Sequence, residues 1–172
     1  TLYIADMYRG IIQQATWSGP GTYLRARIDQ YALDKVYGHG RIWRVTHDGM
    51  ERDRTQPRML SETPAQLLRQ LSHPNGWWRD TAQQLLVLKQ DKSVVPALVK
   101  MAAQGGSPQA RVHALWSLDG LQALNDGVIA AGLSDAHPGV RENALRLAES
   151  RLDASAELRE KARALVSDSD SH

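Results

Sequence analysis

From residue 61 onward, apolar residues recur every three or four positions, which is the period of an amphipathic α-helix. Ser61 or Thr63 is positioned to cap a first helix that carries Leu67, Leu68 and Leu71. Turns rich in Gly, Pro, Asn and Ser separate the later apolar runs from one another. We therefore expect a helix at 77–89, one that begins at 93, one that runs through 112–120 and one that ends at 133. Two more are expected at 138–147 and at 155–165.

A short pattern recurs at the start of several of these helices, an arginine followed three residues later by an alanine. The first three copies begin 32 and then 30 residues apart, a period typical of α-solenoids, in which two-helix units stack on one another. The four copies are Arg79 with Ala82, Arg111 with Ala114, Arg141 with Ala144, and Arg159 with Ala162.

The two residue types of this pattern predict different roles. Alanine is small enough to let neighbouring helices approach closely. Each arginine falls in the first turn of its helix, where the helix dipole disfavours a cation, so that its charge needs a partner. We expect the guanidinium to donate to turn carbonyls, or to an acid such as Asp135 in its own unit or the next. The alternative is a ladder of arginines that binds a ligand.

The clearest copy of the pattern has a recognisable form. It runs from Leu133 through the turn acceptor Asp135 to Val140, the first apolar residue of its helix, and on through Arg141 to Ala144. This stretch resembles HEAT repeats, including those of PBS-lyase type. The resemblance extends over residues 61 to about 165 and implies a mainly α fold, an α-solenoid of about three and a half units.

The first sixty residues have a different composition, with all five Tyr and frequent Gly, which favours strands and loops. We expect strand pieces at Leu2–Arg9 and Ile11–Gln13, a short helix within Tyr23–Val36 and a strand at Gly40–Thr46. The predicted organisation is a β-rich segment at 1–50, a linker at 51–60, the solenoid at 61–166 and a disordered, acidic, serine-rich tail at 167–172.

Two stretches of the β-rich segment, Tyr3 to Gly10 and Gly40 to Val45, resemble the closing propeller blade of bacterial putative membrane-bound dehydrogenases of the glucose/sorbosone, PQQ-linked type. In that family a propeller precedes HEAT repeats, often with a cytochrome c domain. The resemblance implies an exported or periplasmic parent protein with PQQ and calcium, and haem c on another domain. It places Asp6, Tyr8 and Arg9 near the propeller mouth with Arg41 nearby, as catalytic candidates. The alternative is that Asp6 and Arg9 pair with each other or with strand-end backbone.

Composition narrows the chemistry further. The chain has no cysteine, so it builds no disulfide, thiol nucleophile or Cys-ligated metal. Its six histidines show no metal-binding spacing, and no apolar run is long enough to span a membrane. The net charge is +2, with −1 over residues 61–172, so a nucleic-acid partner is not favoured.

The leading hypothesis is therefore a non-catalytic interaction or scaffold module, the C-terminal part of a propeller-type redox protein. Its expected partners are its own propeller or another protein, and no cofactor is expected in this chain itself. Two alternatives remain open. In the first, Asp6, Tyr8, Arg9 and Arg41 contribute to the pocket of a PQQ-linked sugar or alcohol dehydrogenase. In the second, the arginine-rich face of the solenoid binds nucleic acid.

Overall fold

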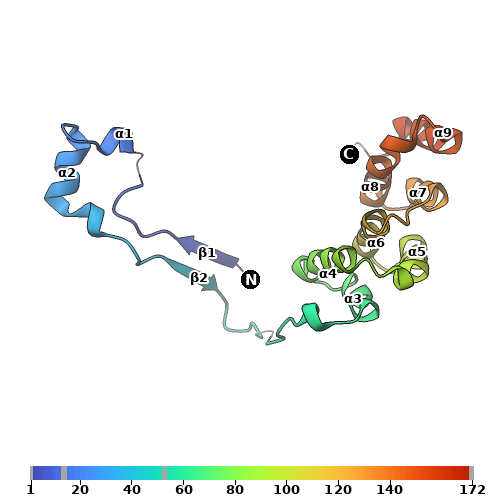
Figure 1. Ribbon diagram of the computed structural model, residues 1–172, viewed down its shortest axis with the longest axis horizontal. Coiled ribbons are helices and arrows are strands. Elements are labelled where there is room, and N and C mark those ends of the chain that lie inside the picture. The colour runs from blue at the N-terminus through green and yellow to red at the C-terminus, as the bar shows by residue number, and fades with distance from the viewer. Residues whose placement is uncertain (1, 13–14, 52–53, 171–172) are drawn as a thin grey trace. The chain divides into compact units, whose positions relative to one another are not determined.

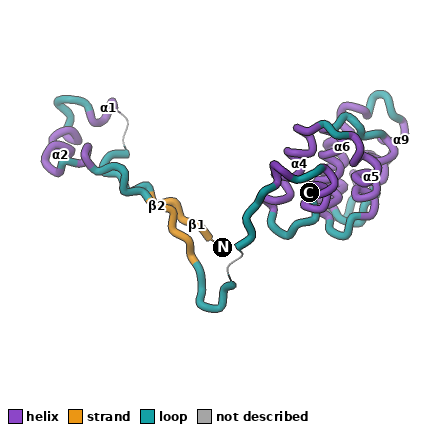
Figure 2. Tube along the Cα trace, turned by 60° about the horizontal axis from the view of Figure 1, so that its bottom comes forward, coloured by secondary structure: helices purple, strands orange, loops and turns teal. Residues whose placement is uncertain are grey.

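The computed structural model describes residues 2–12, 15–51 and 54–170. Its chain forms two compact units, Thr1–Arg54 and Thr55–His172. The two strands belong to the first unit, and the second unit is helical (Figures 1 and 2). The prediction of a mainly helical α-solenoid with a short N-terminal β-rich segment is confirmed.

The first unit is built on a two-stranded antiparallel ribbon. Strand β1 (Leu2–Asp6) pairs with strand β2 (Arg41–Val45), with Leu2 opposite Val45 and Asp6 opposite Arg41. The chain between the strands holds the short helix α1 (Ala15–Ser18), helix α2 (Tyr23–Tyr31) and a 3-10 turn at Leu33–Lys35. Thr22 caps α2 by accepting a hydrogen bond from the Arg25 N–H.

Two details of this unit differ from the sequence prediction. Ile11 and Ile12 lie outside any strand, and Gln13 lies outside the described residues. The helix predicted within Tyr23–Val36 ends at Tyr31, because Ala32 adopts a left-handed conformation that stops the α-helical hydrogen bonding. The chain continues from there as the 3-10 turn.

The second unit is a stack of paired helices. Its first pair is preceded by a 3-10 turn at Met59–Ser61, and another 3-10 turn at Lys92–Val94 leads into α5. The helices are α3 (Pro64–Gln70), α4 (Gly76–Lys89), α5 (Val95–Gln104), α6 (Pro108–Gly120), α7 (Asp126–Leu133), α8 (Pro138–Ala148) and α9 (Ala156–Ala164).

These helices form two rows. The pairs α3 with α4, α5 with α6, and α7 with α8 pack together, and successive pairs stack through α4 on α6 on α8. In the other row α5 packs on α7 and α7 on α9 (Figure 1). One continuous apolar core runs between the rows. It consists mostly of buried leucines and alanines, among them Leu67, Leu86, Leu98, Leu115, Leu118 and Leu158.

The helix starts follow the capping rules. Polar side chains at the N-cap accept hydrogen bonds from first-turn N–H groups that have no partner inside the helix. Thr63 forms a reciprocal capping box with Gln66, and His137 caps α8 by accepting from the Gly139 N–H at 3.1 Å. The other caps that initiate helices of the stack are Asn75, Ser107, Asn125 and Ser155.

Candidate interaction site

The repeat arginines fold back onto the turns that precede their helices. The Arg141 Nη1 group donates to the carbonyl oxygens of Asp135 at 3.0 Å and Ala136 at 3.1 Å. The other three use the same Nη1 group on the equivalent turns: Arg79 on His73 and Pro74, Arg111 on Gly105, and Arg159 on Leu152 and Asp153. Each arginine therefore donates hydrogen bonds to backbone carbonyls of the turn before its own helix.

Two of these arginines also reach an acid that lies further along the chain. Arg111 donates from Nε and Nη2 to the two carboxylate oxygens of Asp135, at 2.7 and 2.9 Å. Arg141 makes the same two-pronged contact with Asp168, at 2.7 and 2.5 Å. All four side chains are partly shielded from solvent by the stack.

Asp168 is held in the same local geometry as Asp135. One oxygen of Asp135 accepts the His137 N–H at 2.8 Å, and one oxygen of Asp168 accepts the Asp170 N–H at 2.9 Å. The hydrogen bond from Arg141, and then that from Asp170, lower the pKa of Asp168 below its ordinary value. The described part of the segment that the sequence predicts as a disordered tail, residues 167–170, is thus bound to the solenoid as a turn.

The first helix pair of the stack, α3 with α4, departs from this pattern. The position equivalent to Asp135 is Gly105, where a Cβ atom would lie 2.6 Å from the Met101 carbonyl oxygen. No acid can be placed there without moving the backbone, and the buried Nε of Arg79 has no hydrogen-bond partner among the described residues. Arg79 is therefore tied to its own turn alone.

The repeat alanines mark close helix contacts. Ala82, Ala114 and Ala144 have no exposed surface, whereas Ala162 in α9 is only partly buried. A Cβ atom on Gly132 would lie 2.8 Å from the Cβ of Ala144, so α7 and α8 meet at a distance that only small residues allow.

Hydrogen bonds also link successive helices of the α4–α6–α8 row. His113 Nδ1 lies 2.7 Å from Gln83 Oε1, and Trp116 Nε1 donates to Asn143 Oδ1 at 2.8 Å. His113 and Asn143 each follow a repeat arginine by two positions, so this is a repeated feature of the stack. Burial lowers the pKa of His113, and Arg79 lowers it further, while Asp80 acts in the opposite direction.

The tryptophans of the solenoid do not form one exposed platform. Trp78 is buried and stacks on His73 with 4.8 Å between ring centroids. Trp116 is half-buried and bonded to Asn143. Trp77 is exposed and borders a hollow of about 370 Å³ with Met59, Leu60 and Leu85.

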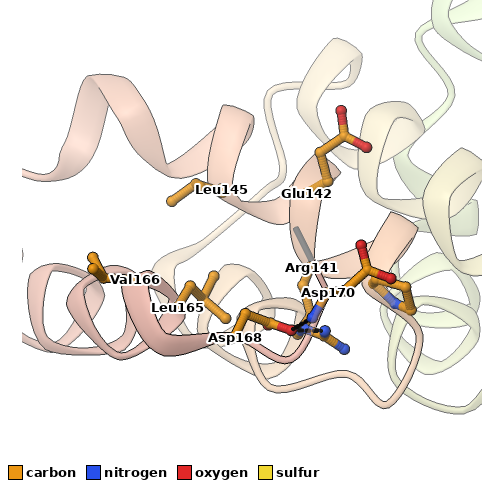
Figure 3. Close-up of a pocket in the computed structure, with 8 residues that line it drawn as sticks. Arg141, Glu142, Leu145, Leu165, Val166, Asp168 and Asp170 are labelled. Atoms are coloured by element: carbon orange, nitrogen blue, oxygen red, sulfur yellow. Dashed lines mark hydrogen bonds and ion pairs between the residues drawn. The ribbon is translucent and has the colours of Figure 1, made fainter. Parts of the chain in front are cut away.

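The outer face of α8 borders the largest of the hollows described here, about 420 Å³ in volume. The hollow is lined by Pro138, Glu142 and Leu145 of α8, by Leu165, Val166 and Asp170, and by the ion pair of Arg141 with Asp168 (Figure 3). We call this surface the α8 groove. It combines exposed apolar side chains with carboxylates.

In the first unit, two of the candidate residues are direct cross-strand neighbours. Asp6 lies opposite Arg41, and its carboxylate accepts hydrogen bonds from the Trp43 indole N–H and the Tyr8 backbone N–H, both at 3.2 Å. These two bonds, with Trp43 contributing most, lower the pKa of Asp6. Arg41 donates to the His39 carbonyl and lies 5.9 Å from the centre of the Trp43 ring. Trp43 is the member of this cluster that the sequence analysis missed.

The other two candidates lie apart from that carboxylate. The Tyr8 ring is exposed and packs edge-on against His39. Arg9 lines a separate hollow of about 300 Å³ with Ile11, Leu33, Asp34, Val36 and Tyr37. The structure therefore brings Asp6, Arg41 and Trp43 together but does not gather all four candidates into one site.

The ribbon exposes large apolar side chains on both faces. Residues that alternate along a strand point to opposite faces, and Tyr3 and Ile4 in β1 are both exposed, as are Ile42 and Trp43 in β2. Among the described residues, each strand pairs only with the other, so one edge of each strand is free of strand partners. Two strands alone are marginally stable in water.

A search of the described residues for metal sites finds no group of three or more His, Asp or Glu side chains able to hold an ion. Within the same residues, no helix is long and apolar enough to cross a membrane.

Comparison with known proteins gives one match. A family described as a domain of unknown function, DUF7133, matches residues 1–49, which is most of the first unit. No curated protein and no solved structure matches the chain.

Proposed function

We propose that this chain is a non-catalytic protein-interaction module, in which a braced helical stack supports surfaces that bind other polypeptides. The observation that carries the proposal is the ribbon of the first unit, which leaves Tyr3, Ile4, Ile42 and Trp43 exposed to solvent. Apolar patches of this kind mark surfaces that another protein covers. Free strand edges add a template for pairing with a further strand.

The finer form of the proposal is that the ribbon belongs to a propeller blade and that the solenoid is of HEAT type. The antiparallel pairing of β1 with β2 supports a blade, because blades are antiparallel sheets of four strands. The repeated Arg-turn contacts and the two rows of helices support a HEAT-type stack. An exported redox protein remains the proposed parent.

The nucleic-acid alternative is weakened by what the arginines do. Arg79, Arg111, Arg141 and Arg159 all donate to turn carbonyls, and two of them also donate to carboxylates. Guanidinium groups bound in this way are not free to contact phosphate. The observation favours bracing over a nucleic-acid surface.

The redox alternative requires one pocket made by Asp6, Tyr8, Arg9 and Arg41. Arg9 lines a different hollow from the one in which Asp6 and Arg41 meet, and the Asp6 carboxylate is already occupied by Trp43 and Tyr8. These residues therefore do not fit a shared PQQ site within this chain.

Site-specific cross-linking tests the interaction function. A photo-reactive amino acid is placed at Ile42, on the ribbon, and in a matched control at Tyr23, which is equally exposed but lies on α2. In the cells that make the protein, position 42 is expected to cross-link to an extended, apolar segment identified by mass spectrometry. Equal yields from positions 42 and 23 would contradict the proposal.

A further inference from the structure

Side chains fasten the contact between α6 and α8 at both of its ends. Where the two helices start, Arg111 binds Asp135 through two hydrogen bonds of 2.7 and 2.9 Å. Where they finish, Arg151 donates to the Asp126 carboxylate and to the Leu124 carbonyl, both at 3.1 Å, which ties the chain after α8 to the chain after α6. The two helices therefore cannot turn on each other without breaking one of these contacts.

The contact between α4 and α6 is fastened firmly only where the helices finish. There the Gln90 amide group donates to the Gly120 carbonyl at 3.0 Å, and a Cβ atom on Gly120 would lie 2.5 Å from a methyl group of Val87. Where the helices start, Gly105 stands at the position of the acid, and Arg79 donates only to the carbonyls of its own turn. The ion pair that closes the α6–α8 contact thus has no counterpart here.

One hydrogen bond remains between α4 and α6 nearer their starts. It joins the side chains of His113 and Gln83, with 2.7 Å between Nδ1 and Oε1. The Nε group of Arg79 is buried and has no partner in the described part of the chain. A buried donor without a partner costs free energy, which contact with water would recover. Arg79 therefore favours separation of the two helix starts, whereas Arg111 opposes it.

The second row of helices adds little at the same place. In that row α5 packs on α7 and α7 on α9, whereas α3 packs chiefly on the 3-10 turn at Lys92–Val94. This turn belongs to the connection that follows α4, close to the end of the pair that is already fastened. The packing of α3 therefore does not compensate for the missing ion pair.

We infer that the α3–α4 pair pivots as one body on the rest of the stack about the contact of Gln90 with Gly120. The turns before α4 and α6 separate in this motion, while the turns before α6 and α8 stay together. The chain enters the stack through α3, so the pivot moves the point at which the first unit is attached. The inference goes beyond the proposed interaction function and does not rest on it.

Pairs of nitroxide spin labels measure the pivot, because the chain has no cysteine of its own to interfere. Pro74, Gly106 and Ala136 are exposed and lie directly before the caps of α4, α6 and α8. One variant combines Pro74→Cys with Gly106→Cys, and its matched control combines Gly106→Cys with Ala136→Cys. Electron paramagnetic resonance of the labelled proteins gives the spread of distances in each pair. We expect a spread about two-fold wider or more for 74 with 106 than for 106 with 136.

A third protein transfers the proposed weakness to the next contact. Asp135→Gly places at the α6–α8 contact the residue that Gly105 supplies at the α4–α6 contact. We expect this substitution to widen the spread of distances between labels at 106 and 136. The spread between labels at 74 and 106 should stay as it was.

Equal spreads for the two pairs without Asp135→Gly would overturn the inference, and that comparison needs no destabilised variant. An unchanged spread between 106 and 136 in a folded Asp135→Gly protein would also overturn it. Hydrogen exchange distinguishes a pivot from unfolding of the pair. The amides of α4 are expected to be protected as well as those of α6, and much faster exchange in α4 would contradict motion as one body. Cross-linking from Ile42 concerns the ribbon, so its outcome is independent of these measurements.

Discussion

Arg111 of α6 reaches Asp135, 24 residues further along the chain, through two hydrogen bonds of 2.7 and 2.9 Å. The same guanidinium donates to the Gly105 carbonyl of its own turn. One side chain thereby joins the turn before α6 to the turn before α8. Such a two-pronged contact fixes distance and orientation together, so it sets the register of one unit on the next.

Removing this acid is expected to weaken the stack. Asp135→Ala leaves the shielded Arg111 without its carboxylate and frees the His137 N–H, at a cost of about 1.5 to 3 kcal/mol in unfolding free energy. Urea denaturation of the full chain measures this cost. The matched control is Asp119→Ala, an exposed acid in α6. A loss no greater than that of the control would show that the ion pair is not structural.

Overpacking distinguishes the repeat alanines from one another. Ala144→Leu is expected to destabilise the protein by about 1 to 3 kcal/mol, because Ala144 has no free surface and faces Gly132. Ala162→Leu, at the same register position in the partly buried helix α9, is expected to cost less than about 0.5 kcal/mol. Thermal melts of both variants test the pair, and equal losses would mean that the contacts at the two positions are equally tight.

Acid should release the Asp168 turn. The pKa of Asp168 lies below its ordinary value of 3.8, because Arg141 and the Asp170 N–H stabilise the carboxylate. The ion pair therefore contributes stability that is complete above pH 3.8 and is lost as the pH falls through the lower, folded-state pKa. Asp168→Asn should lower the melting temperature at neutral pH and remove this part of the acid dependence. Parallel acid titrations of variant and wild type would refute the assignment.

Protonation of His113 is also expected to lower stability, but the cause is burial of the ring and not the loss of an ion pair. Burial lowers its pKa below the ordinary 6.5, so below that pH the unfolded chain takes up a proton that the folded chain resists, and stability falls. His113→Asn places at this position the residue found at Asn143 in the next unit. Between about pH 7.5 and about pH 5.5 the variant should lose less melting temperature than the wild type. An identical loss in both proteins would be the contrary result.

The sequence predicted the solenoid well because its signals are local and repeated. The arginine and alanine spacing identified α4, α6 and α8, the second helices of three pairs, while its fourth copy lies in α9 of the other row. Thr63 was already a cap candidate. Asp135 was named beforehand as an arginine partner. Asp168 was missed because an acidic, serine-rich segment has no apolar period, and only the three-dimensional position of Arg141 shows its role.

The first unit was harder to predict for a physical reason. Strands β1 and β2 pair across more than thirty intervening residues, and the sequence of neither strand indicates which strand it pairs with. The Trp43 bond to Asp6 depends on that pairing, so it could not be foreseen from spacing. The strand piece predicted from Ile11 is wrong at Ile11 and Ile12, because apolar residues in a loop and in a strand look alike in a sequence.

Hydrogen exchange of the ribbon tests most directly whether the first unit is an interaction surface. We predict that the amides of Leu2–Asp6 and Arg41–Val45 exchange rapidly in the isolated chain, since two strands alone are marginal, while α6 and α8 stay protected. In the native assembly the same strand amides should exchange about ten-fold or more slowly, with the helices unchanged. Strand amides equally protected in the isolated chain and in the assembly would contradict an interaction role for the ribbon.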